Sequence, residues 1–452
     1  MFVLKILLGL AGLGIVVIVH ELGHFIAARL AGIDVEAFSI GWGKPVLKKQ
    51  IGAVEYRLGM FPLGGYCKMR GENEFEEAYK NNRNAISPVK GTFFGAKPWQ
   101  RILVAFAGPF FNLVFAALVF SIIWGVGFTT LTMGNRIVLA SDIVGEETAF
   151  PANAAGLESG DRIIAIDGAP VETFGDIREK IAINPEKKLS LKVDRGGSVQ
   201  DISITPNLDK NTGAGTIGVY YWVDPVVNDV VQTGPAKAAG LKQGDRILKV
   251  NGKDIEYSVA LIPVLQDRPQ TLAVDFERDG ETARTGLQPI YTNEGVDLGF
   301  SFQMLEYRMP RLSPFAAIGK GLSEAWKALT VSVKSFALLF KGIDLTQAVS
   351  GPVRITYMLG DVAAAGFSSS FADGIRNMAD FLCLISIALC VMNLLPLPVL
   401  DGGLIALFII EIFKRGPLNP KFISIFQTVG VVLICALMLF AVFGDVLYLV
   451  RL

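Results

Sequence analysis

Long hydrophobic runs alternate with polar stretches along the whole chain. The runs cover residues 1–31, 100–127, 379–403 and 422–449. Each is long enough to cross the hydrocarbon core of a bilayer, which takes about 20 consecutive apolar residues in a helix. The pattern therefore predicts a polytopic α-helical membrane protein with four transmembrane helices.

The first run also occupies the place of a cleaved signal peptide. Lys5 provides only a weak positive start, however, and the apolar stretch is longer than the core of an ordinary signal peptide. Cleavage would also remove both histidines of the chain, His20 and His24. We therefore interpret the first run as a transmembrane helix.

The polar segments between the runs differ in pattern. Residues 32–99 contain short alternating stretches such as Val54–Leu58 between glycines, which predict strands in a β region. Within this segment, residues 72–92 are charged and rich in asparagine and predict a loop. Residues 404–421, between the third and fourth runs, also predict a loop.

The segment after the second run contains an internal repeat. Ala154–Ile163 recurs as Ala238–Ile247, and each copy continues into a strand and a hairpin signal, at Asp167-Gly168 and Asn251-Gly252. The offset is too long for a solenoid unit. The repeat instead predicts two copies of one small domain, over residues 128–213 and 214–306.

The remaining segment, residues 307–378, has an amphipathic pattern. Between residues 313 and 342, apolar side chains such as Trp326 alternate with lysines such as Lys327. This pattern predicts a helix lying at a membrane surface. A helix packed on the repeated domains is the alternative, and a true membrane crossing would invert the direction of the third spanning helix.

Composition limits the possible functions further. Hydrophobic residues make up 51% and charged residues 19% of the 452-residue chain, and the net charge is +0. The charge balance argues against nucleic acid as a partner, since such binding rests on excess positive charge. Four cysteines show no disulfide or zinc-finger spacing.

The positions of Lys and Arg predict the orientation of the spans. The segments between the first and second runs and between the third and fourth runs are rich in Lys and Arg, whereas the termini offer only Lys5 and Arg451. Cytoplasmic loops carry such an excess. We therefore expect both linking segments in the cytoplasm and the repeated domains outside it.

The first predicted helix contains His20-Glu21-Leu22-Gly23-His24. Two histidines at i and i+4 lie on one face of a helix and suit a single Zn²⁺ ion, with Glu21 placed to take a proton from water. Ionisable groups inside a spanning helix are costly to bury and are mostly functional. A polar seam satisfied by other helices is the structural alternative.

A catalytic zinc needs a third protein ligand, and the chain has no third histidine. Asp401 is the strongest candidate, because it follows a stretch with two prolines that ends the third helix and precedes Gly402-Gly403. Cys383 and Cys390 are thiol alternatives. If helices 1 and 3 run parallel, both motifs lie at the same depth, in the cytoplasmic half of the membrane.

Together, His20-Glu21-Leu22-Gly23-His24 and Asn393-Leu394-Leu395-Pro396-Leu397-Pro398-Val399-Leu400-Asp401-Gly402 resemble the paired signatures of the site-2 protease family of intramembrane zinc metalloproteases. The repeated segments resemble tandem PDZ domains. The resemblance covers nearly the whole chain and implies a bacterial inner-membrane protein with two inserted PDZ-like α+β domains in the periplasm.

The resemblance also implies an activity and partners. It implies regulated intramembrane proteolysis of single-pass membrane proteins in the envelope stress response, with an anti-sigma factor and remnant signal peptides as substrates. It implies a membrane-dipping β region whose glycines, with Asn393, hold an unwound substrate strand, a role assigned to Gly41, Gly43, Gly64 and Gly65. The PDZ-like pair would exclude bulky substrates.

Two other classes of function compete with the protease. A catalytically inactive scaffold would bind partners through the PDZ-like domains, but it would not need Glu21 beside a histidine pair. A zinc transporter would use a metal site at mid-membrane, but large external domains and a base beside the metal do not suit transport. Zinc content together with cleavage of a membrane peptide separates the three.

Overall fold

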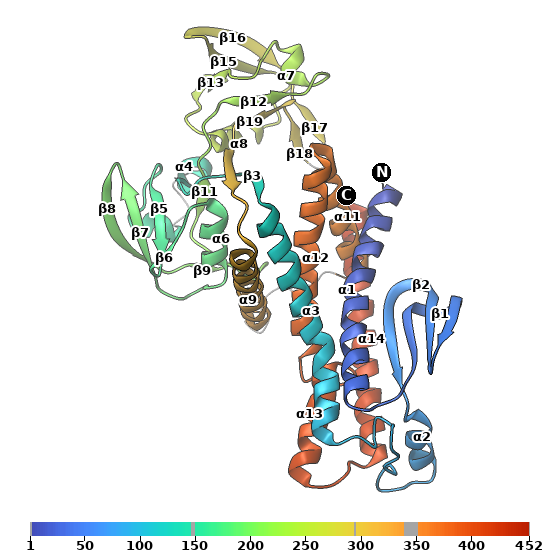
Figure 1. The fold of residues 1–452 in the computed structure, drawn as a ribbon. Helices are drawn as coiled ribbons and strands as arrows, with labels where there is room; N and C mark the ends of the chain where they lie inside the picture. Colours follow the sequence, from blue (N-terminus) through green and yellow to red (C-terminus); the bar gives the residue numbers. More distant parts are fainter. Residues whose placement is uncertain (1, 146–149, 293–294, 339–350, 452) are drawn as a thin grey trace. The chain divides into compact units, whose positions relative to one another are not determined.

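The computed structural model describes residues 2–145, 150–292, 295–338 and 351–451, which form two compact units (Figure 1). The helical unit comprises the described residues of 1–128, 310–336 and 349–451. The inserted unit comprises chiefly residues 129–309. The metal-binding motifs expected from the sequence all lie in the helical unit.

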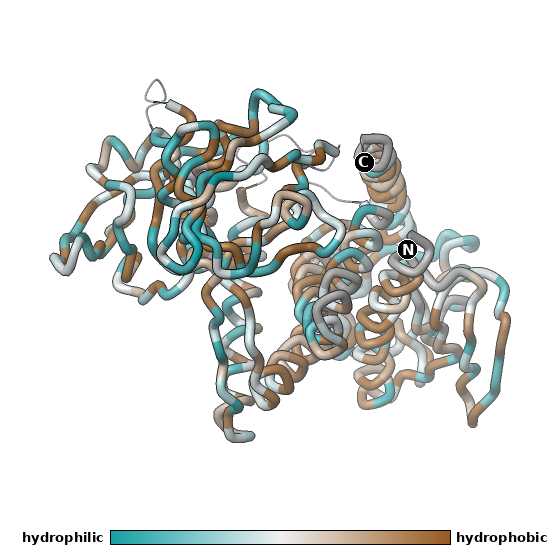
Figure 2. Tube along the Cα trace, turned by 90° about the horizontal axis from the view of Figure 1, so that it is seen from above, coloured by the Kyte–Doolittle hydropathy of each residue, from teal (hydrophilic) through white to brown (hydrophobic). Residues whose placement is uncertain are grey.

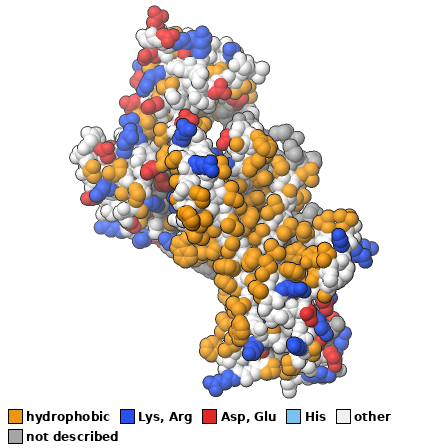
Figure 3. All heavy atoms as spheres, viewed as in Figure 1, with side chains coloured by type: hydrophobic (Ala, Val, Ile, Leu, Met, Phe, Trp, Pro, Cys, Tyr) orange, Lys and Arg blue, Asp and Glu red, His pale blue; other side chains and the backbone are white. Residues whose placement is uncertain are grey.

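Four helices of the described chain are long and apolar enough to cross a membrane. They are α1 (Phe2–Leu30), α3 (Pro98–Val126), α12 (Phe371–Asn393) and α14 (Pro420–Arg451). The helices beside the two marked termini are brown for much of their length in Figure 2, and hydrophobic side chains cover much of the helical unit in Figure 3. The four expected helices are thus present, and the third begins eight residues earlier than residue 379.

Two segments expected to be loops contain helices. Helix α13 (Asp401–Lys414) occupies much of residues 404–421, and α2 (Glu72–Lys80) begins the stretch 72–92. The loop predictions were wrong over residues 72–80 and 404–414, because apolar residues in these segments are buried by partners distant in sequence. Ala78 and Ile86 share a small core with Leu407 and Ile423.

The described part of the segment expected to be amphipathic is largely helical. Helix α9 (Pro314–Leu338) is not among the candidate membrane spans, and it packs on α3 through its small residues, with Gly321 against Ser121. Residues 339–342 of the expected stretch lie outside the described residues. Helix α11 (Pro352–Ser369) lies against α1 and α12, and its first turn receives the buried Asp445 carboxylate of α14, which accepts from the Gly351 N–H at 2.9 Å.

The β region consists of two long strands, β1 (Val35–Ile51) and β2 (Val54–Met69). Residues 37–40 of β1 pair with both ends of β2, since Phe38 lies opposite Cys67 on one side and Tyr56 on the other. The antiparallel sheet therefore has residues 65–69 along one edge and residues 47–51 along the other. The edge at 65–69 lies against α1.

The inserted unit contains two copies of one arrangement, as the repeat predicts. The first copy has the sheet β6-β5-β7-β8, and the second has β14-β13-β15-β16. The first comprises β3 (Phe128–Thr132), β4 (Ile137–Leu139), α4 (Ser141–Val144), α5 (Pro151–Ala154), β5 (Arg162–Ile166), β6 (Ala169–Pro170), α6 (Phe174–Ala182), β7 (Leu189–Arg195), β8 (Ser198–Ile204), β9 (Asn207–Leu208), β10 (Gly215–Thr216) and β11 (Val219–Tyr221). The second comprises β12 (Val227–Val230), α7 (Pro235–Ala238), β13 (Arg246–Val250), β14 (Lys253–Asp254), η1 (Ser258–Leu261), α8 (Ile262–Leu265), β15 (Leu272–Arg278), β16 (Glu281–Leu287), β17 (Ile290–Thr292), β18 (Gly295–Asp297), β19 (Phe300–Phe302) and β20 (Leu305–Met309).

The same buried ion pair occurs in both copies. The aspartate of the repeated Gly-Asp segment, Asp161 or Asp245, is fully buried and accepts two hydrogen bonds from one arginine, Arg195 or Arg278. Such a bidentate pair ties the start of one strand to the end of the neighbouring strand. The repeat is therefore preserved at the level of side-chain contacts.

The boundary between the copies lies beyond residue 213. Strand β11 pairs with β4 of the first copy, and Ile217 is buried in the first copy's core. The expected division at 213/214 separated this strand from its own sheet. The repeat identified the copies but not the strand that returns to close the first one, because that strand lies outside the repeated segment.

Candidate metal centre

The structure brings His20, His24 and Asp401 together. One donor atom from each lies within 4.8 Å of the others. The Asp401 carboxylate lies 3.2 Å from Nε2 of His20 and 3.4 Å from Nε2 of His24, and the two Nε2 atoms are 3.2 Å apart. The two motifs that are distant in sequence therefore meet.

The turn between α12 and α13 places the Asp401 carboxylate beside the histidines. Helix α12 ends at Asn393, the chain turns through the proline-rich stretch with a positive φ of 77° at Val399, and α13 begins at Asp401. A Cβ added at Gly402 or Gly403 would lie 2.3 or 2.1 Å from a carbonyl oxygen of this turn. The glycines thus let the helix start fold back onto the turn, as the sequence predicted.

The two thiol alternatives do not reach this cluster. Cys383 is buried on α12 with its sulfur 3.7 Å from the carbonyl oxygen of Ala116, and Cys390 is buried one to two turns further along α12. Neither belongs to the group of donor atoms formed by the described residues. Asp401 is therefore the carboxylate that the fold presents to the histidines.

Helix α3 forms the wall beside the histidines. A Cβ added at Gly108 would lie 2.4 Å from Nε2 of His24 and 2.8 Å from Cε1 of His20. A Cβ added at Gly23 of α1 would lie 2.3 Å from the carbonyl oxygen of Ala107. The two helices approach this closely only because both positions lack a side chain.

Hydrogen bonds from α3 and α12 reach both imidazole rings. Nδ1 of His24 donates to the carbonyl oxygen of Val104 at 2.8 Å, which leaves the lone pair of Nε2 facing the cluster. Nδ2 of Asn112 lies 3.3 Å from Nδ1 of His20, and Nδ2 of Asn393 lies 3.4 Å from Nε2 of the same ring. Asn393 was expected at the site, whereas the place of Asn112 was not predicted.

Glu21 lies on the side of α1 that faces the β region. Its carboxylate accepts a main-chain hydrogen bond from Cys67, and a Cβ added at Gly65 would lie 3.3 Å from its Cγ. The edge of the sheet at residues 65–69 thus runs directly beside this carboxylate.

The other predicted glycines lie further along the sheet. Gly64 has a φ of +89° and packs on Trp42, and a Cβ added there would lie 2.2 Å from the indole nitrogen. Gly41 and Gly43 also have positive φ, where β1 turns between its two paired halves. Gly65, unlike Gly64, has Glu21 among its nearest neighbours.

A buried ion pair holds α13 against α3. Nη2 of Arg101 donates to Glu411 at 2.7 Å, both side chains are at most one-tenth exposed, and the guanidinium lies over the ring of Phe408. The sequence did not reveal this pair, because Glu411 lies in a segment that was expected to be a loop. The pair fixes the helix that carries Asp401.

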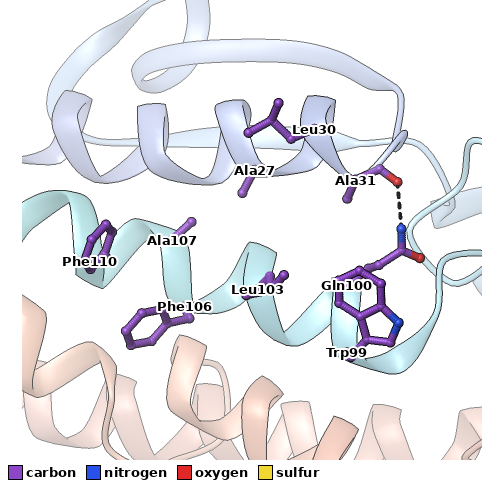
Figure 4. A pocket seen from close by; sticks show the side chains of 9 residues that line it. All are labelled: Ala27, Leu30, Ala31, Trp99, Gln100, Leu103, Phe106, Ala107 and Phe110. Carbon is purple, nitrogen blue, oxygen red and sulfur yellow. Dashed lines mark hydrogen bonds between the residues drawn. The ribbon is translucent and has the colours of Figure 1, made fainter.

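An apolar cavity of about 380 Å³ lies between the end of α1 and the start of α3 (Figure 4). It is lined by Ala27, Leu30, Ala31, Trp99, Gln100, Leu103, Phe106, Ala107 and Phe110. Its lining contains none of the histidine, glutamate or aspartate residues of the cluster. The cavity does not carry the chemistry of the site.

The donor set fits a divalent metal ion. One imidazole nitrogen from each histidine converges with one carboxylate, which is a ligand set of catalytic zinc sites. The opposite nitrogen of His24 is hydrogen-bonded to Val104, and the opposite nitrogen of His20 has Asn112 beside it. Two nitrogen lone pairs and a carboxylate this close together would repel one another without a cation between them. The residues present therefore match a three-ligand site with a fourth position open for water.

A two-histidine, one-carboxylate cluster with an adjacent glutamate, built among helices long enough to span a membrane, defines a class, the membrane metallopeptidases. The chain belongs to peptidase family M50, the family of the site-2 proteases, whose model matches residues 8–437. A Treponema pallidum protein with the provisional name zinc metalloprotease is 36% identical over 99% of both chains. The regulator of sigma-E protease RseP of Salmonella typhimurium is 30% identical over 96% of both chains, and that of Escherichia coli is 28% identical over 96% of this chain and 97% of its own.

Proposed function

We propose that this chain is an intramembrane zinc endopeptidase that cleaves the membrane segments of single-pass proteins. The observation that carries the proposal is the convergence of His20 and His24, on a helix long and apolar enough to cross a membrane, with Asp401 at the start of α13, and with Glu21 beside them. Its four long apolar helices make the chain a membrane protein, with the cluster at membrane depth.

The cofactor is Zn²⁺. Relatives that match nearly the whole chain are named zinc metalloproteases, and the ligand set is one that zinc prefers. His20, His24 and Asp401 would hold the ion, which would supply Lewis-acid chemistry for activating a water molecule and polarising the scissile carbonyl group.

The protein's own residues then handle the proton and the peptide. Glu21 accepts the proton of the attacking water and returns it to the leaving amide nitrogen, a role for which it lies between the two histidines in sequence and beside the sheet edge in space. Asn393, whose amide reaches the ring of His20, holds the substrate main chain near the reacting carbonyl.

The edge of the sheet provides a place for an unwound substrate. A helical membrane segment hides its peptide bonds in its own hydrogen bonds, and an edge strand offers replacements for them. Residues 65–69 form an edge in the described sheet and pass beside Glu21. Gly65 is the first residue of this edge and Gly64 precedes it, whereas Gly41 and Gly43 lie where β1 turns.

The names of the relatives support the substrates and the location that we assign. Two of them are named regulators of sigma-E protease, so we assign an anti-sigma factor in the envelope stress response and remnant signal peptides as substrates. The chain would lie in the bacterial inner membrane. The two copies of the inserted unit are PDZ-like, lie in the periplasm and exclude bulky substrates. Their described residues supply none of the three residues of the cluster, which leaves the copies free for such a role.

Glu21→Gln tests the proposal against the scaffold and the transporter. The purified chain in detergent should contain about one zinc ion and cleave a model membrane peptide. The variant should keep its zinc and lose cleavage by about 10²–10⁴-fold, the contribution of a general base. A native chain that binds zinc but cleaves no peptide contradicts the protease, and full cleavage by the variant removes Glu21 from the mechanism.

A further inference from the structure

Three positions of α3 face the histidine motif at helical spacing. Val104, Gly108 and Asn112 are four residues apart and so lie on one face of the helix. The Val104 carbonyl receives Nδ1–H of His24, and Gly108 leaves room for both rings. Asn112 continues this stripe and lies beside Nδ1 of His20. One helix therefore meets the outer nitrogen of each ring.

The side-chain amide of Asn112 is incompletely hydrogen-bonded among the described residues. It is fully buried, and its Oδ1 atom is without a hydrogen-bond partner among the described residues. A buried amide oxygen left without a donor is costly. Nδ2 of this amide lies 3.3 Å from Nδ1 of His20.

The chemistry of the site decides which end of the amide faces the ring. Nε2 of His20 faces His24 and Asp401, so metal binding needs its lone pair, and the ring proton must then lie on Nδ1. An N–H on Nδ1 requires an acceptor. Because the oxygen and nitrogen of an amide are interchangeable in shape, rotation of the Asn112 amide by half a turn places Oδ1 where this acceptor is needed.

We propose that Asn112 is a positioning residue, whose side-chain carbonyl accepts Nδ1–H of His20 and holds the ring with Nε2 toward the metal. It does for His20 what the Val104 carbonyl does for His24. The inference rests on the proposed metal site, and it adds a specific source for the orientation of the first ligand. Partners of this kind fix the tautomer of a ligating histidine and raise its affinity for the metal.

The test compares Asn112→Leu, which removes the acceptor at similar volume, with Asn112→Asp, which keeps it. Ser386→Ala is the packing control, because Ser386 bonds the main-chain carbonyl of Asn112 at 2.9 Å and not its side chain. Each full-length variant in detergent is titrated with Zn²⁺ against a chromophoric chelator. The absorption spectrum of the Co²⁺-substituted protein reports the ligand geometry.

We expect Asn112→Leu to bind Zn²⁺ about 10–100-fold more weakly and to change the Co²⁺ spectrum. Asn112→Asp and Ser386→Ala should retain native affinity and spectrum. Native affinity in Asn112→Leu, or equal losses in Asn112→Leu and Asn112→Asp, overturns the inference. If Asn112→Leu does not fold, weaker Zn²⁺ binding by Asn112→Asp than by the native chain overturns the inference, and native affinity in Asn112→Asp supports it. A native chain that binds no zinc would instead contradict the proposed function.

Discussion

Gly108→Ala tests how tightly α3 is fitted against the metal centre. The added methyl carbon would lie 2.4 Å from Nε2 and 2.6 Å from Cε1 of His24, and 2.8 Å from Cε1 of His20. Carbon–nitrogen and carbon–carbon contacts settle at about 3.5–4.0 Å. Either the rings or the helix must therefore move by roughly 1 Å.

The surroundings prevent an easy adjustment. The ring of His24 is held by its bond to Val104, and α3 is packed against α1, α12 and α13. A misplacement of about 1 Å in an active site can cost 10²-fold in rate, and zinc ligands tolerate only about 0.2 Å. We expect a loss of cleavage of about 10²-fold or more together with weaker zinc binding.

Gly125→Ala is the matched control on the same helix. The nearest atom to its added methyl is Cβ of Ala317 at 3.6 Å, an ordinary contact. Both changes improve helix propensity by about 1 kcal/mol, so neither should lower helix stability by itself. Cleavage of a membrane peptide and zinc content are measured for both variants. Native zinc content and native cleavage in Gly108→Ala would refute this account of the helix contact.

Two further predictions test how the carboxylate is supplied and how its helix is held. Asp401→Ala should lower zinc content as well as cleavage, since the described chain offers the histidines no other carboxylate or thiol ligand; metal analysis showing full zinc would contradict the assignment. Arg101→Leu should lower the free energy of unfolding by about 3–5 kcal/mol, because it leaves the buried Glu411 carboxylate unpaired, whereas Arg101→Leu with Glu411→Leu should recover most of that loss. Thermal unfolding in detergent measures both, and equal losses in the single and double variants would show that the ion pair is not the cause.

The sequence by itself determined those features that depend on local spacing. Apolar runs of spanning length predicted the four long helices, and the i, i+4 spacing placed His20 and His24 on one face. The absence of a third histidine and the proline-rich turn indicated Asp401, which the structure places 3.2 Å from His20. The repeated Gly-Asp segments predicted two similar sheets for the same reason, since each copy folds from its own residues.

Only the tertiary structure decided features that need partners distant in sequence. The helix at Asp401–Lys414 is stabilised by burial of Leu407 and by the pair between Glu411 and Arg101, and its own sequence between two spans looked like a loop. Likewise, nothing local distinguishes Gly108 or Asn112 from other small or polar residues in an apolar helix. Their importance arises because α3 packs against α1 with these positions facing the histidines, a contact between residues more than 80 positions apart.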